Sequence, residues 1–328
     1  MLNNTVAVVI INWNGQKLLK RFLPSVINFS EEAKIYIIDN FSTDNSIRFV
    51  NKNYPKIKII NLNKNYGYAE GYNLGLKHVK EDIYILLNND IEVTKNWIKP
   101  IIENFKHNKI DIAQPLLLDL KNPDYFDYSG AGGGFIDKYG YPYCRGRIYD
   151  KIEKNLNQYN NTFRIFWASG ACFIIRKKIF NKLNGFDNSF FMHQEEIDLC
   201  WRAFNQGFNV FCIGESHIYH KGASTLNNNY KKDYFNFRNS LLTLLKNLPG
   251  KSLFSVIIRR FFIDFLLFIF FLIRGKFLTS LMIIKSYLYL IFNFKKVFNK
   301  RTKIFNSKKY YEHNSIIYEY IRFRKDNF

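Results

Sequence analysis

The chain has 328 residues, 47% of them hydrophobic and 18% aromatic, which is enough for a full hydrophobic core and excludes a largely disordered protein. The formal net charge is +21, and residues 241–328 alone hold 17 Lys and Arg against four Asp and Glu. Because the charges of this tail flank long apolar runs, they favour an anionic membrane surface over nucleic acid, for which the sequence contains no recognisable module.

The cysteines and the first residues indicate a reducing compartment. Cys144, Cys172, Cys200 and Cys212 form no Cys-x-x-Cys pair and have no His neighbours at the spacing of a structural zinc site. We therefore expect buried, reduced thiols. The chain passes from its first residues straight into a strand-like run without a basic leader, so we expect no secretory signal and a cytoplasmic location.

Strand-like and helical patterns alternate along the first 90 residues. Continuous runs of β-branched and aliphatic residues occupy 5–11, 35–38, 56–61 and 83–88, and the helical pattern 17–26 separates the first two. Such runs are typical of strands that are buried on both faces of a parallel sheet. Four strands alternating with helices predict a parallel sheet with right-handed crossovers.

Polar residues follow these strands at the points where they end. Asn12-Trp13-Asn14-Gly15 follows the first strand, Asp39 closes the second, and Asn88-Asn89-Asp90 ends the run at 83–88. Ligands of open α/β sheets bind outside the carboxyl ends of the strands, so we expect Asp39 and Asp90 to face one crevice. The alternative is that these residues only form turns, which Asn and Asp also favour.

Three glycines in the third loop, Gly67, Gly71 and Gly75, suggest a turn that cradles phosphate. Their spacing matches neither the dinucleotide-binding fingerprint nor a P-loop, so a standard dinucleotide site is disfavoured. A spacing of four also places them on one face of a helix, where close packing is the alternative explanation.

The middle of the chain is less regular. We expect a helix at 96–105 and a strand at 110–114, followed by a segment at 119–161 that contains several Gly, Pro and Tyr residues and little periodicity. Long irregular segments inside compact domains are usually functional loops. We therefore interpret 119–161 as a substrate-facing flap.

Two adjacent glutamates, Glu195 and Glu196, open a predicted helix at 195–202 after an aromatic approach. Acidic residues at a helix start are usually only favourable charges near the helix dipole. Burial by the aromatic approach would instead raise a carboxylate pKa and suit it to proton transfer.

Further along, a strand at 209–213 leads to His220, which precedes a glycine turn and is either structural or a ligand.

Between the irregular segment and the two glutamates we expect two short strands around Ser169-Gly170 and a short helix at 177–183.

Taken together, these features resemble the family 2 glycosyltransferases of the GT-A fold, most closely the bacterial rhamnosyltransferase-like enzymes that build surface polysaccharides. The matching stretches appear in the same order as in the family: 8–15, 37–46, 65–75, 86–90, 167–176, 185–202 and 220–225.

The resemblance implies an α/β fold of GT-A type, Rossmann-like, with a mostly parallel sheet and helices on both faces. It assigns residues 1–230 to the nucleotide-sugar-binding and catalytic domain and leaves 231–328 as a basic, apolar helical region that associates with a membrane. It also implies that a set of residues binds the nucleotide sugar, with the first three lining the base pocket and Asp39 bonding a pyrimidine: Ile11, Asn12, Trp13, Asp39, Asn65, Asn88 and Asp90.

The resemblance further implies a divalent metal site and a general base. Asp90 matches the position of the ligand of Mg²⁺ or Mn²⁺, ions that prefer carboxylate and phosphate oxygens. His220 matches the family's C-terminal histidine, which either completes the metal shell or touches the phosphates. Glu195 and Glu196 occupy the position of the family's Glu-Asp motif, whose second member is the expected base. Here Glu196 replaces Asp and is one methylene longer, which leaves open which glutamate acts; we favour Glu196.

The implied reaction is an inverting transfer from a UDP- or dTDP-linked sugar to a hydroxyl of a surface-polysaccharide or lipid-linked oligosaccharide acceptor. The alternative is a non-catalytic relative that binds nucleotide sugar and serves as an assembly component. Retention of Asp90, Glu195, Glu196 and His220 favours the enzyme, because a protein that only binds needs no positioned base.

The tail contains apolar runs that are short for a membrane span. The run at 261–273 would extend about 20 Å as a helix, against about 30 Å of hydrocarbon, and the run at 277–292 is interrupted by Lys285. We therefore expect residues 250–300 to form interfacial amphipathic helices on the inner face of the cell membrane. A soluble helical subdomain, a homodimer interface and genuine spanning remain as alternatives.

Overall fold

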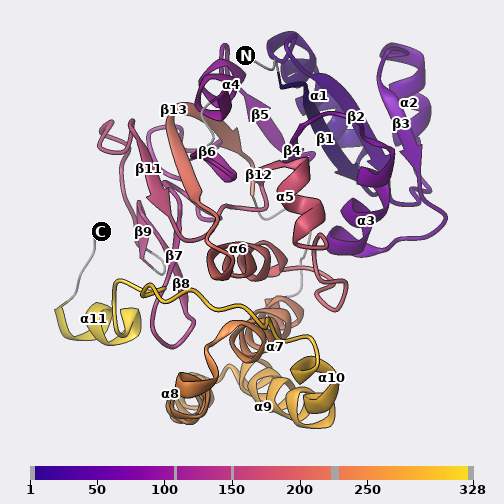
Figure 1. Cartoon of the computed structure of the whole chain (residues 1–328). Helices are drawn as coiled ribbons and strands as arrows, with labels where there is room; N and C mark the ends of the chain where they lie inside the picture. Colours follow the sequence, from indigo (N-terminus) through magenta and orange to yellow (C-terminus); the bar gives the residue numbers. More distant parts are fainter. Residues whose placement is uncertain (1–3, 107–108, 149–150, 223–228, 324–328) are drawn as a thin grey trace.

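The computed structural model describes residues 4–106, 109–148, 151–222 and 229–323, so residues 223–225 of the stretch 220–225 lie outside it (Figure 1). Within the described residues the centre is a nine-stranded sheet of order β11-β13-β6-β12-β4-β1-β2-β3, with β5 paired to β13. Its strands are β1 (Val6–Asn12), β2 (Lys34–Asp39), β3 (Lys58–Asn61), β4 (Ile83–Leu87), β5 (Ile91–Val93), β6 (Ile112–Asp119), β11 (Thr162–Ile165), β12 (Cys172–Arg176) and β13 (Val210–His220).

The first four strands form the parallel part of the sheet. β2 pairs with β1 and β3, and β1 pairs with β4, all in parallel register. The alternation of strands and helices predicted this arrangement, which is confirmed. The carboxyl ends of β1, β2 and β4 therefore meet at one edge, where Asn12 and Asp39 are direct register partners.

The prediction of a mostly parallel sheet is wrong for the part of the sheet that contains β5, β11 and β12. β12 runs antiparallel to both β4 and β6, and β5 and β11 run antiparallel to β13, so the sheet is mixed. β12 is buried along its whole length. A strand buried on both faces has the same apolar pattern whichever way its neighbours run, so the pattern carried no information on direction.

Helices cover both faces of the sheet, as predicted. Alternate side chains of β1 point to opposite faces: Val8 packs in a core with α1 (Gln16–Phe29), α2 (Ser46–Asn53) and α4 (Ile98–Lys106). Val9 packs on the other face with α3 (Gly67–Gly75), α5 (Lys177–Lys182) and α6 (Glu195–Asn205). A short 3₁₀ turn, η1 (Leu76–His78), follows α3.

The predicted third loop is the helix α3, and its glycines serve close packing. A Cβ atom on Gly71 would lie 2.5 Å from Cδ1 of Ile11, and one on Gly75 would lie 2.2 Å from Cδ1 of Ile38. Any side chain at these positions would push α3 away from β1 and β2. The close-packing explanation of the spacing is therefore confirmed.

The segment 119–161 is more ordered than its sequence predicted. It contains a four-stranded antiparallel sheet of order β10-β9-β8-β7 among its described residues. These strands have two or three residues each, too short for a periodic pattern to be visible in the sequence: β7 (Gly134–Ile136), β8 (Pro142–Cys144), β9 (Arg147–Ile148) and β10 (Lys151–Ile152).

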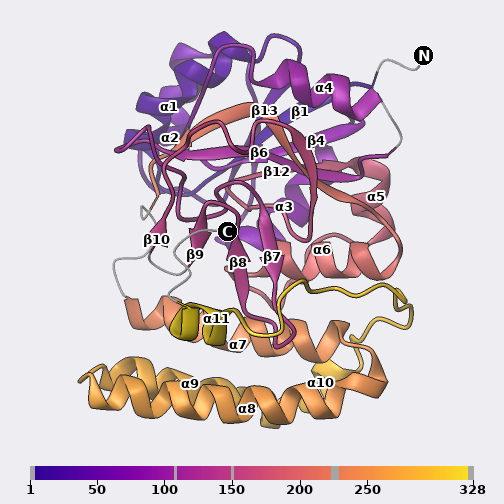
Figure 2. The same cartoon turned by 90° about the vertical axis from the view of Figure 1, so that its left-hand side faces the viewer.

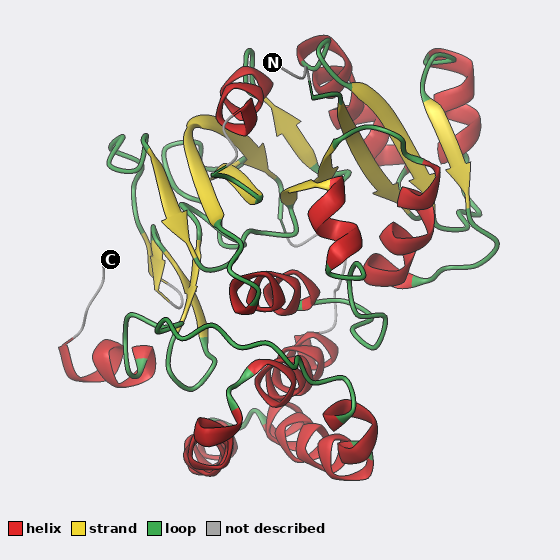
Figure 3. Ribbon diagram, viewed as in Figure 1, coloured by secondary structure: helices red, strands yellow, loops and turns green. Residues whose placement is uncertain are grey.

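Helices form the C-terminal part of the chain. Figure 2 shows α8 and α9 side by side beneath α7, as a layer on the side away from the large sheet, and Figure 3 shows that this layer contains no strand among its described residues. The helices are α7 (Asn229–Asn247), α8 (Gly250–Ile273), α9 (Phe277–Phe292), α10 (Phe294–Phe298) and α11 (Ile316–Phe323). No helix in the described part of the chain is long and apolar enough to cross a membrane.

Buried ion pairs join α7 to the sheet domain. The Lys246 ammonium group lies 2.7 Å from Asp187 Oδ2 and 2.7 Å from Asp198 Oδ1, and its side chain is only 3% exposed. Asp198 belongs to α6, the helix that carries Glu195 and Glu196. The position of these glutamates therefore depends on the packing of α7.

The four cysteines are free and buried, as predicted. Burial raises the pKa of the thiols of Cys144, Cys172, Cys200 and Cys212. Raised pKa values keep these thiols protonated and unreactive, so they act as core residues.

Candidate active site

The carboxyl edge of β1, β2 and β4 is held together by Asn12. The side chain of Asn12 is fully buried; its Nδ2 donates to Asp39 Oδ1 at 3.4 Å, and its Oδ1 accepts from Asn89 Nδ2 at 3.1 Å. One side chain thus connects the loop after β4, which carries Asp90, to the end of β2. Asp39 and Asp90 share one edge, as the strand pattern predicted.

The residues expected around the nucleotide base differ in exposure. Trp13 is 52% exposed at this edge, Ile11 is half-buried, and the Asp39 carboxylate accepts a hydrogen bond from the Ser42 backbone N–H at 3.1 Å. The exposed indole ring of Trp13 offers a stacking face, and the nearly buried Asp39 carboxylate offers a hydrogen-bond acceptor at the same edge. This pair suits a flat, polar heterocycle.

Two other expected donor-binding residues have local structural contacts. Asn65 accepts hydrogen bonds from Asn40 Nδ2 at 3.0 Å and from the Gly67 backbone N–H at 2.9 Å, which holds the turn that starts α3. The Asn88 backbone N–H donates to the Ala171 carbonyl at 3.0 Å, which ties the end of β4 to the start of β12. Their side-chain roles toward a donor stay predictions.

His220 brings two aspartates together at the end of β13. Its Nε2 lies 3.3 Å from Asp90 Oδ1 and its Nδ1 lies 3.1 Å from Asp127 Oδ2. All three side chains are at most 6% exposed. Burial alone would lower the pKa of His220, but the hydrogen bonds to Asp127 and Asp90 outweigh it and raise the pKa to about 10.

The Asp90–His220 pair fits a divalent cation. Two ligands on adjacent positions of an octahedral ion with bonds of about 2.1 Å lie about 3 Å apart, close to the observed 3.3 Å. Among the described residues no group of three or more His, Cys, Asp or Glu has metal-binding geometry. The remaining ligands would have to be diphosphate oxygens and water, which is how Mg²⁺ is commonly held.

Asp127 is a site residue that the sequence did not single out. It belongs to the segment 119–161, which had no interpretable periodicity, and it reaches His220 only because that segment folds back on β6. The one available signal was an aspartate between the aromatic pair Tyr125-Phe126 and Tyr128. That signal cannot be told from a surface turn without the fold.

Glu195 and Glu196 begin α6 in a nearly dry environment. Glu195 is 4% exposed, and the Oε2 atoms of both glutamates are buried without a hydrogen-bond partner in the described structure. Burial, and then the charge of Glu196, raise the pKa of Glu195 well above its usual value; burial raises the pKa of Glu196 to about 7. A carboxylate with a pKa near 7 can exchange a proton at neutral pH.

The approach to these glutamates is strained and supported from α7. His193 and Gln194 both have left-handed backbones, with φ of 66° and 65°. Asn239 on α7 donates to the carbonyls of Met192 and His193, at 2.8 and 2.7 Å. Strained backbone persists where its surroundings hold it, and it is frequent at functional sites.

A short series of contacts joins the Asp90–His220 pair to Glu196. Asp127, bonded to His220, lies two residues before Ser129, whose carbonyl accepts a hydrogen bond from Ser169 Oγ. The next residue, Gly170, faces Glu196: a Cβ atom on Gly170 would lie 3.8 Å from the Glu196 carboxyl carbon. The contacts thus lead from the end of β13 and the loop after β4, through the segment of Asp127, to Gly170 beside Glu196 on α6.

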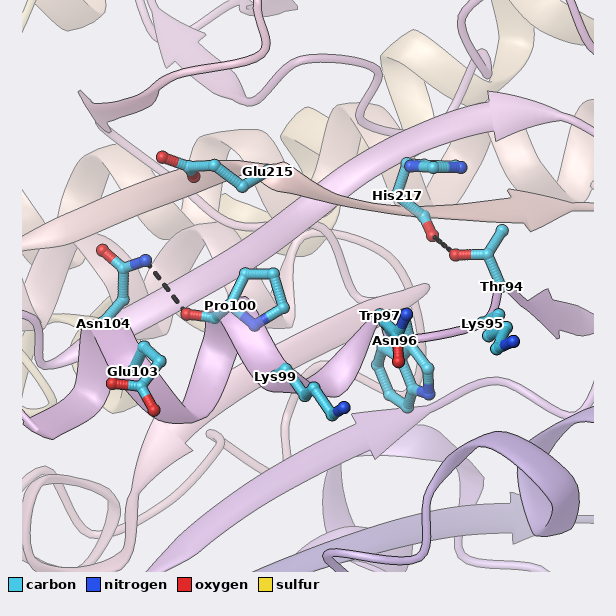
Figure 4. A pocket seen from close by; sticks show the side chains of 10 residues that line it. All are labelled: Thr94, Lys95, Asn96, Trp97, Lys99, Pro100, Glu103, Asn104, Glu215 and His217. Carbon is cyan, nitrogen blue, oxygen red and sulfur yellow. Dashed lines mark hydrogen bonds between the residues drawn. The ribbon is translucent and has the colours of Figure 1, made fainter.

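A separate hollow lies away from this edge. It has a volume of about 550 Å³ and lies between α4 and the middle of β13, where Figure 4 shows Lys99, Glu103, Glu215 and His217 around it. None of the predicted site residues lines it.

Comparison of the sequence with models of known protein families identifies the class of this protein. The model described as Glycosyl transferase family 2 matches residues 7–183, more than half of the chain, so the class is that of the glycosyltransferases. The chain belongs to glycosyl transferase family 2.

Curated relatives of the chain are glycosyltransferases of low sequence identity. The chain is 25% identical to the rhamnosyltransferase WbbL of Escherichia coli, over 66% of this chain and 83% of that protein. It is 23% identical to the N-acetylglucosaminyl-diphospho-decaprenol L-rhamnosyltransferase of Mycobacterium tuberculosis, over 68% and 78%. The match to the hexosyltransferase Agl10 of Haloferax volcanii, also 23% identical, covers 62% of this chain and 63% of that protein, less than two thirds of its length.

Solved structures share the fold. GalNAc-T7, solved with UDP, GalNAc and Mn²⁺, superposes with a TM-score of 0.58 at 19% identity, over 74% of this chain and 48% of that one. The mannosyltransferase PcManGT of Pyrobaculum calidifontis, solved with GDP-Man and Mn²⁺, has a TM-score of 0.52 at 9% identity, over 90% and 76%. At these identities the likeness shows a GT-A-like α/β fold.

Proposed function

We propose that the protein is an inverting glycosyltransferase that moves a hexosyl or rhamnosyl group from a UDP- or dTDP-linked sugar to a hydroxyl of a surface-polysaccharide or lipid-linked oligosaccharide acceptor. The observation that carries the proposal is the series of contacts from the Asp90–His220 pair to Glu196. A donor diphosphate beside Asp90 and an acceptor hydroxyl beside Glu196 would meet at one sugar carbon.

Glu196 is the proposed general base. Its carboxylate accepts the proton of the acceptor hydroxyl, whose oxygen bonds to the anomeric carbon as the bond from that carbon to the diphosphate oxygen breaks. Attack from the face opposite the leaving diphosphate inverts the configuration. With a pKa of about 7, the carboxylate is ionised often enough and is basic enough to act near neutral pH.

Glu195 is proposed as a supporting residue. It is more deeply buried than Glu196, and burial together with the charge of Glu196 raises the pKa of its carboxyl well above the usual value. In this proposal Glu195 is the member of the pair that keeps its proton. A neutral neighbour spares Glu196 the repulsion of a second negative charge when it ionises.

The edge residues bind the donor in this proposal. Trp13 and Ile11 line the base pocket, the fully buried Asn12 supports it from beneath, and Asp39 accepts a hydrogen bond from the pyrimidine, while Asn65, Asn88 and Asp90 face the sugar diphosphate. When bound at Asp90 and His220, Mg²⁺ or Mn²⁺ supplies positive charge to the leaving diphosphate. GalNAc-T7 and PcManGT, which share the fold, were solved with Mn²⁺.

The names of two relatives support the acceptor. The Mycobacterium tuberculosis enzyme is named for an acceptor sugar on diphospho-decaprenol, a lipid carrier, and both it and WbbL are named rhamnosyltransferases. A lipid-linked acceptor requires the enzyme to work at a membrane surface. The C-terminal helices of this chain have a surface that suits that place.

The hairpin of α8 and α9 buries several polar side chains and exposes many large apolar ones. On α8, Arg260 and Asp264 are 1% and 0% exposed and pair at 2.9 Å. Tyr141 and Tyr287 donate hydrogen bonds to Asp264 at 2.6 and 2.8 Å. The opposite face of α8 presents Phe262, Leu266 and Ile273, which are 60%, 68% and 81% exposed. This polarity is the reverse of a soluble helix.

The same pattern continues on α9 and around the hairpin. Ser280 and Ser286 are fully buried on α9, while Leu278, Ile291 and Phe292 are 56%, 66% and 82% exposed. Exposed cations border this apolar face: Lys251, Arg259, Arg274, Lys276, Lys285, Lys295 and Lys296. Apolar side chains with flanking Lys and Arg favour the interface of an anionic bilayer.

We therefore propose that residues 231–328 hold the catalytic domain, residues 1–230, peripherally on the inner face of the cell membrane. A second copy of the chain is the other occupant that an apolar face of this kind could have. The net charge of +21, concentrated in this tail, favours anionic lipid, because two like-charged faces repel each other.

A donor screen tests the enzymatic proposal. The purified chain is incubated with UDP- and dTDP-sugars, a lipid-diphosphate sugar acceptor and Mn²⁺, and nucleoside diphosphate release is measured. The proposal expects release from at least one donor that depends on acceptor and metal. Thermal protection by a pyrimidine nucleotide without any release would indicate a binding protein, and protection only by an oligonucleotide would overturn the proposal.

A further inference from the structure

We propose that Asp127 is a positioning residue that orients His220 for its part in holding a divalent cation. The inference rests on the proposed function, since it deepens the role given to the Asp90–His220 pair. The observation behind it is that two carboxylates lie on opposite nitrogens of one buried imidazole, Asp127 on Nδ1 and Asp90 on Nε2.

The two aspartates are not equivalent. Asp90 follows β4 at the sheet edge, where the donor diphosphate is proposed to lie. Asp127 lies in the segment after β6, on the other side of the ring, and its carboxylate is 3% exposed. The imidazole ring of His220 has Nδ1 toward Asp127 and Nε2 toward Asp90. Only Nε2 can therefore bind a cation that Asp90 also binds. Asp127 is thus placed to hold the ring rather than to bind the same ligand.

Asp127 is itself firmly held. Its backbone N–H donates to the Leu117 carbonyl on β6 at 2.8 Å, and its Oδ2 accepts from the Ser129 backbone N–H at 2.6 Å. β6 in turn pairs in parallel with β13, which ends at His220. The support therefore comes from the strand next to the histidine, and the position of the ring is set by the sheet.

A carboxylate on Nδ1 has a defined chemical effect. It accepts the Nδ1–H hydrogen bond and fixes the plane of the ring, so that Nε2 presents its lone pair once its proton is displaced by an arriving cation. Nε2 then points toward Asp90 Oδ1, 3.3 Å away, at the separation of two neighbouring ligands. Supporting carboxylates of this type usually contribute about 10- to 100-fold to metal affinity.

The test measures Mn²⁺ binding to the full chain by electron paramagnetic resonance, with and without uridine diphosphate. The variants are Asp127→Ala, Asp127→Asn and His220→Ala. The control is Asp124→Asn, which changes an exposed aspartate of the same segment that pairs only weakly with Lys154, at 3.5 Å. Binding of uridine diphosphate without metal is measured in parallel, because a merely structural role would alter it as well.

We expect Asp127→Ala to weaken Mn²⁺ binding about 10- to 100-fold. Asp127→Asn, which keeps an oxygen acceptor, should weaken it less, and metal-free nucleotide binding should be unchanged in both. If Asp127→Ala fails to fold, Asp127→Asn, which has the same shape, decides alone. Wild-type Mn²⁺ affinity in the folded Asp127 variants, or an equal loss of metal-free nucleotide binding, would overturn the inference.

The outcome for His220→Ala separates this inference from the proposed function. If His220→Ala weakens Mn²⁺ binding and the Asp127 variants do not, the metal role of His220 stands and only the positioning role of Asp127 is lost. If neither residue affects Mn²⁺ binding, both roles are lost. The donor screen still decides sugar transfer, because it measures nucleoside diphosphate release by the unmodified chain.

Discussion

The Tyr68 hydroxyl donates a hydrogen bond of 2.8 Å to the carbonyl oxygen of Gly170. Tyr68 is on α3, and Gly170 precedes β12 and faces the Glu196 carboxyl group. The bond thus ties the helix beside β1 to the loop that forms one wall around the proposed base. Burial, and after it the neighbouring Tyr72, raise the pKa of Tyr68 well above its usual value, so the hydroxyl remains a donor.

Removal of this hydroxyl should affect catalysis more than folding. Tyr68→Phe loses one neutral hydrogen bond, so the free energy of unfolding should fall by about 1 kcal/mol. The Gly170 loop would no longer be fixed against Glu196, and kcat should fall several-fold with little change in the KM for the donor. Tyr66→Phe is the control, because the Tyr66 hydroxyl donates to Asn63 on the surface and does not contact Gly170. Equal kcat values for both variants would contradict the expectation.

The pH dependence of transfer should follow Glu196. Burial raises the pKa of this carboxyl to about 7, and the base acts only when it has lost its proton. The rate should therefore be low in acid, rise about tenfold per pH unit below pH 7, and level off above it. The measurement is kcat at saturating donor and acceptor between pH 5.5 and 8.5. A flat profile over this range would exclude Glu196 as the base.

The buried ion pairs of Lys246 should be important for stability. Lys246→Met leaves Asp187 and Asp198 without their shared cation, and loss of one partner of a buried pair costs about 3–5 kcal/mol. Lys300→Met is the matched control: Lys300 also pairs with Asp187, at 2.7 Å, but its side chain is 35% exposed, and such pairs contribute about 1 kcal/mol or less. Urea-induced unfolding of both variants measures the difference in the free energy of unfolding. Similar midpoints would show that the buried ion pairs of Lys246 stabilise the fold no more than the exposed pair of Lys300.

The outer face of α8 should control membrane binding. Phe262, Leu266 and Ile273 lie on one side of the helix at 3.6 residues per turn, opposite Arg260 and Asp264. Replacing all three by Ser removes about 1.5 kcal/mol or more of apolar transfer energy each, so binding to anionic vesicles should fall more than tenfold.

Co-sedimentation with phosphatidylglycerol vesicles measures this change. Leu156→Ser, at an apolar position that is 72% exposed on the catalytic domain, is the control and should bind as the wild type does. Vesicle binding by the triple variant at the wild-type level would contradict the membrane proposal. A change from dimer to monomer in light scattering would identify a second copy of the chain as the partner of this face.

Much of the sheet edge could be predicted from the sequence. The runs at 5–11 and 83–88 are apolar at every position because both faces of β1 and β4 are covered, and the polar residues begin where the chain leaves the core. This contrast between buried strand and polar end is local, so it is visible without the fold. It correctly predicted that the polar ends of β1, β2 and β4 lie at one edge, where Asn12 bonds both Asp39 and Asn89, the residue before Asp90.

What the sequence could not show depends on contacts between distant segments. The direction of β12 is set by its neighbours β4 and β6, and Asp127 becomes part of the site only because its segment packs on β6 beside β13. The run at 261–273 is almost entirely apolar, so its pattern could not reveal that Asp264 faces inward. Only the pairing of α8 with Tyr141 and Tyr287 shows this.

The most direct test of the account is sugar transfer by Glu196→Gln compared with Glu195→Gln. Both amides keep the size of the side chain, and Mn²⁺-dependent nucleotide binding, measured in the same preparations, shows that the donor site is intact. The account predicts that Glu196→Gln binds the nucleotide normally but transfers radiolabelled sugar about 10²–10⁴-fold more slowly, while Glu195→Gln loses much less. Transfer by folded Glu196→Gln at the wild-type rate would contradict the central claim.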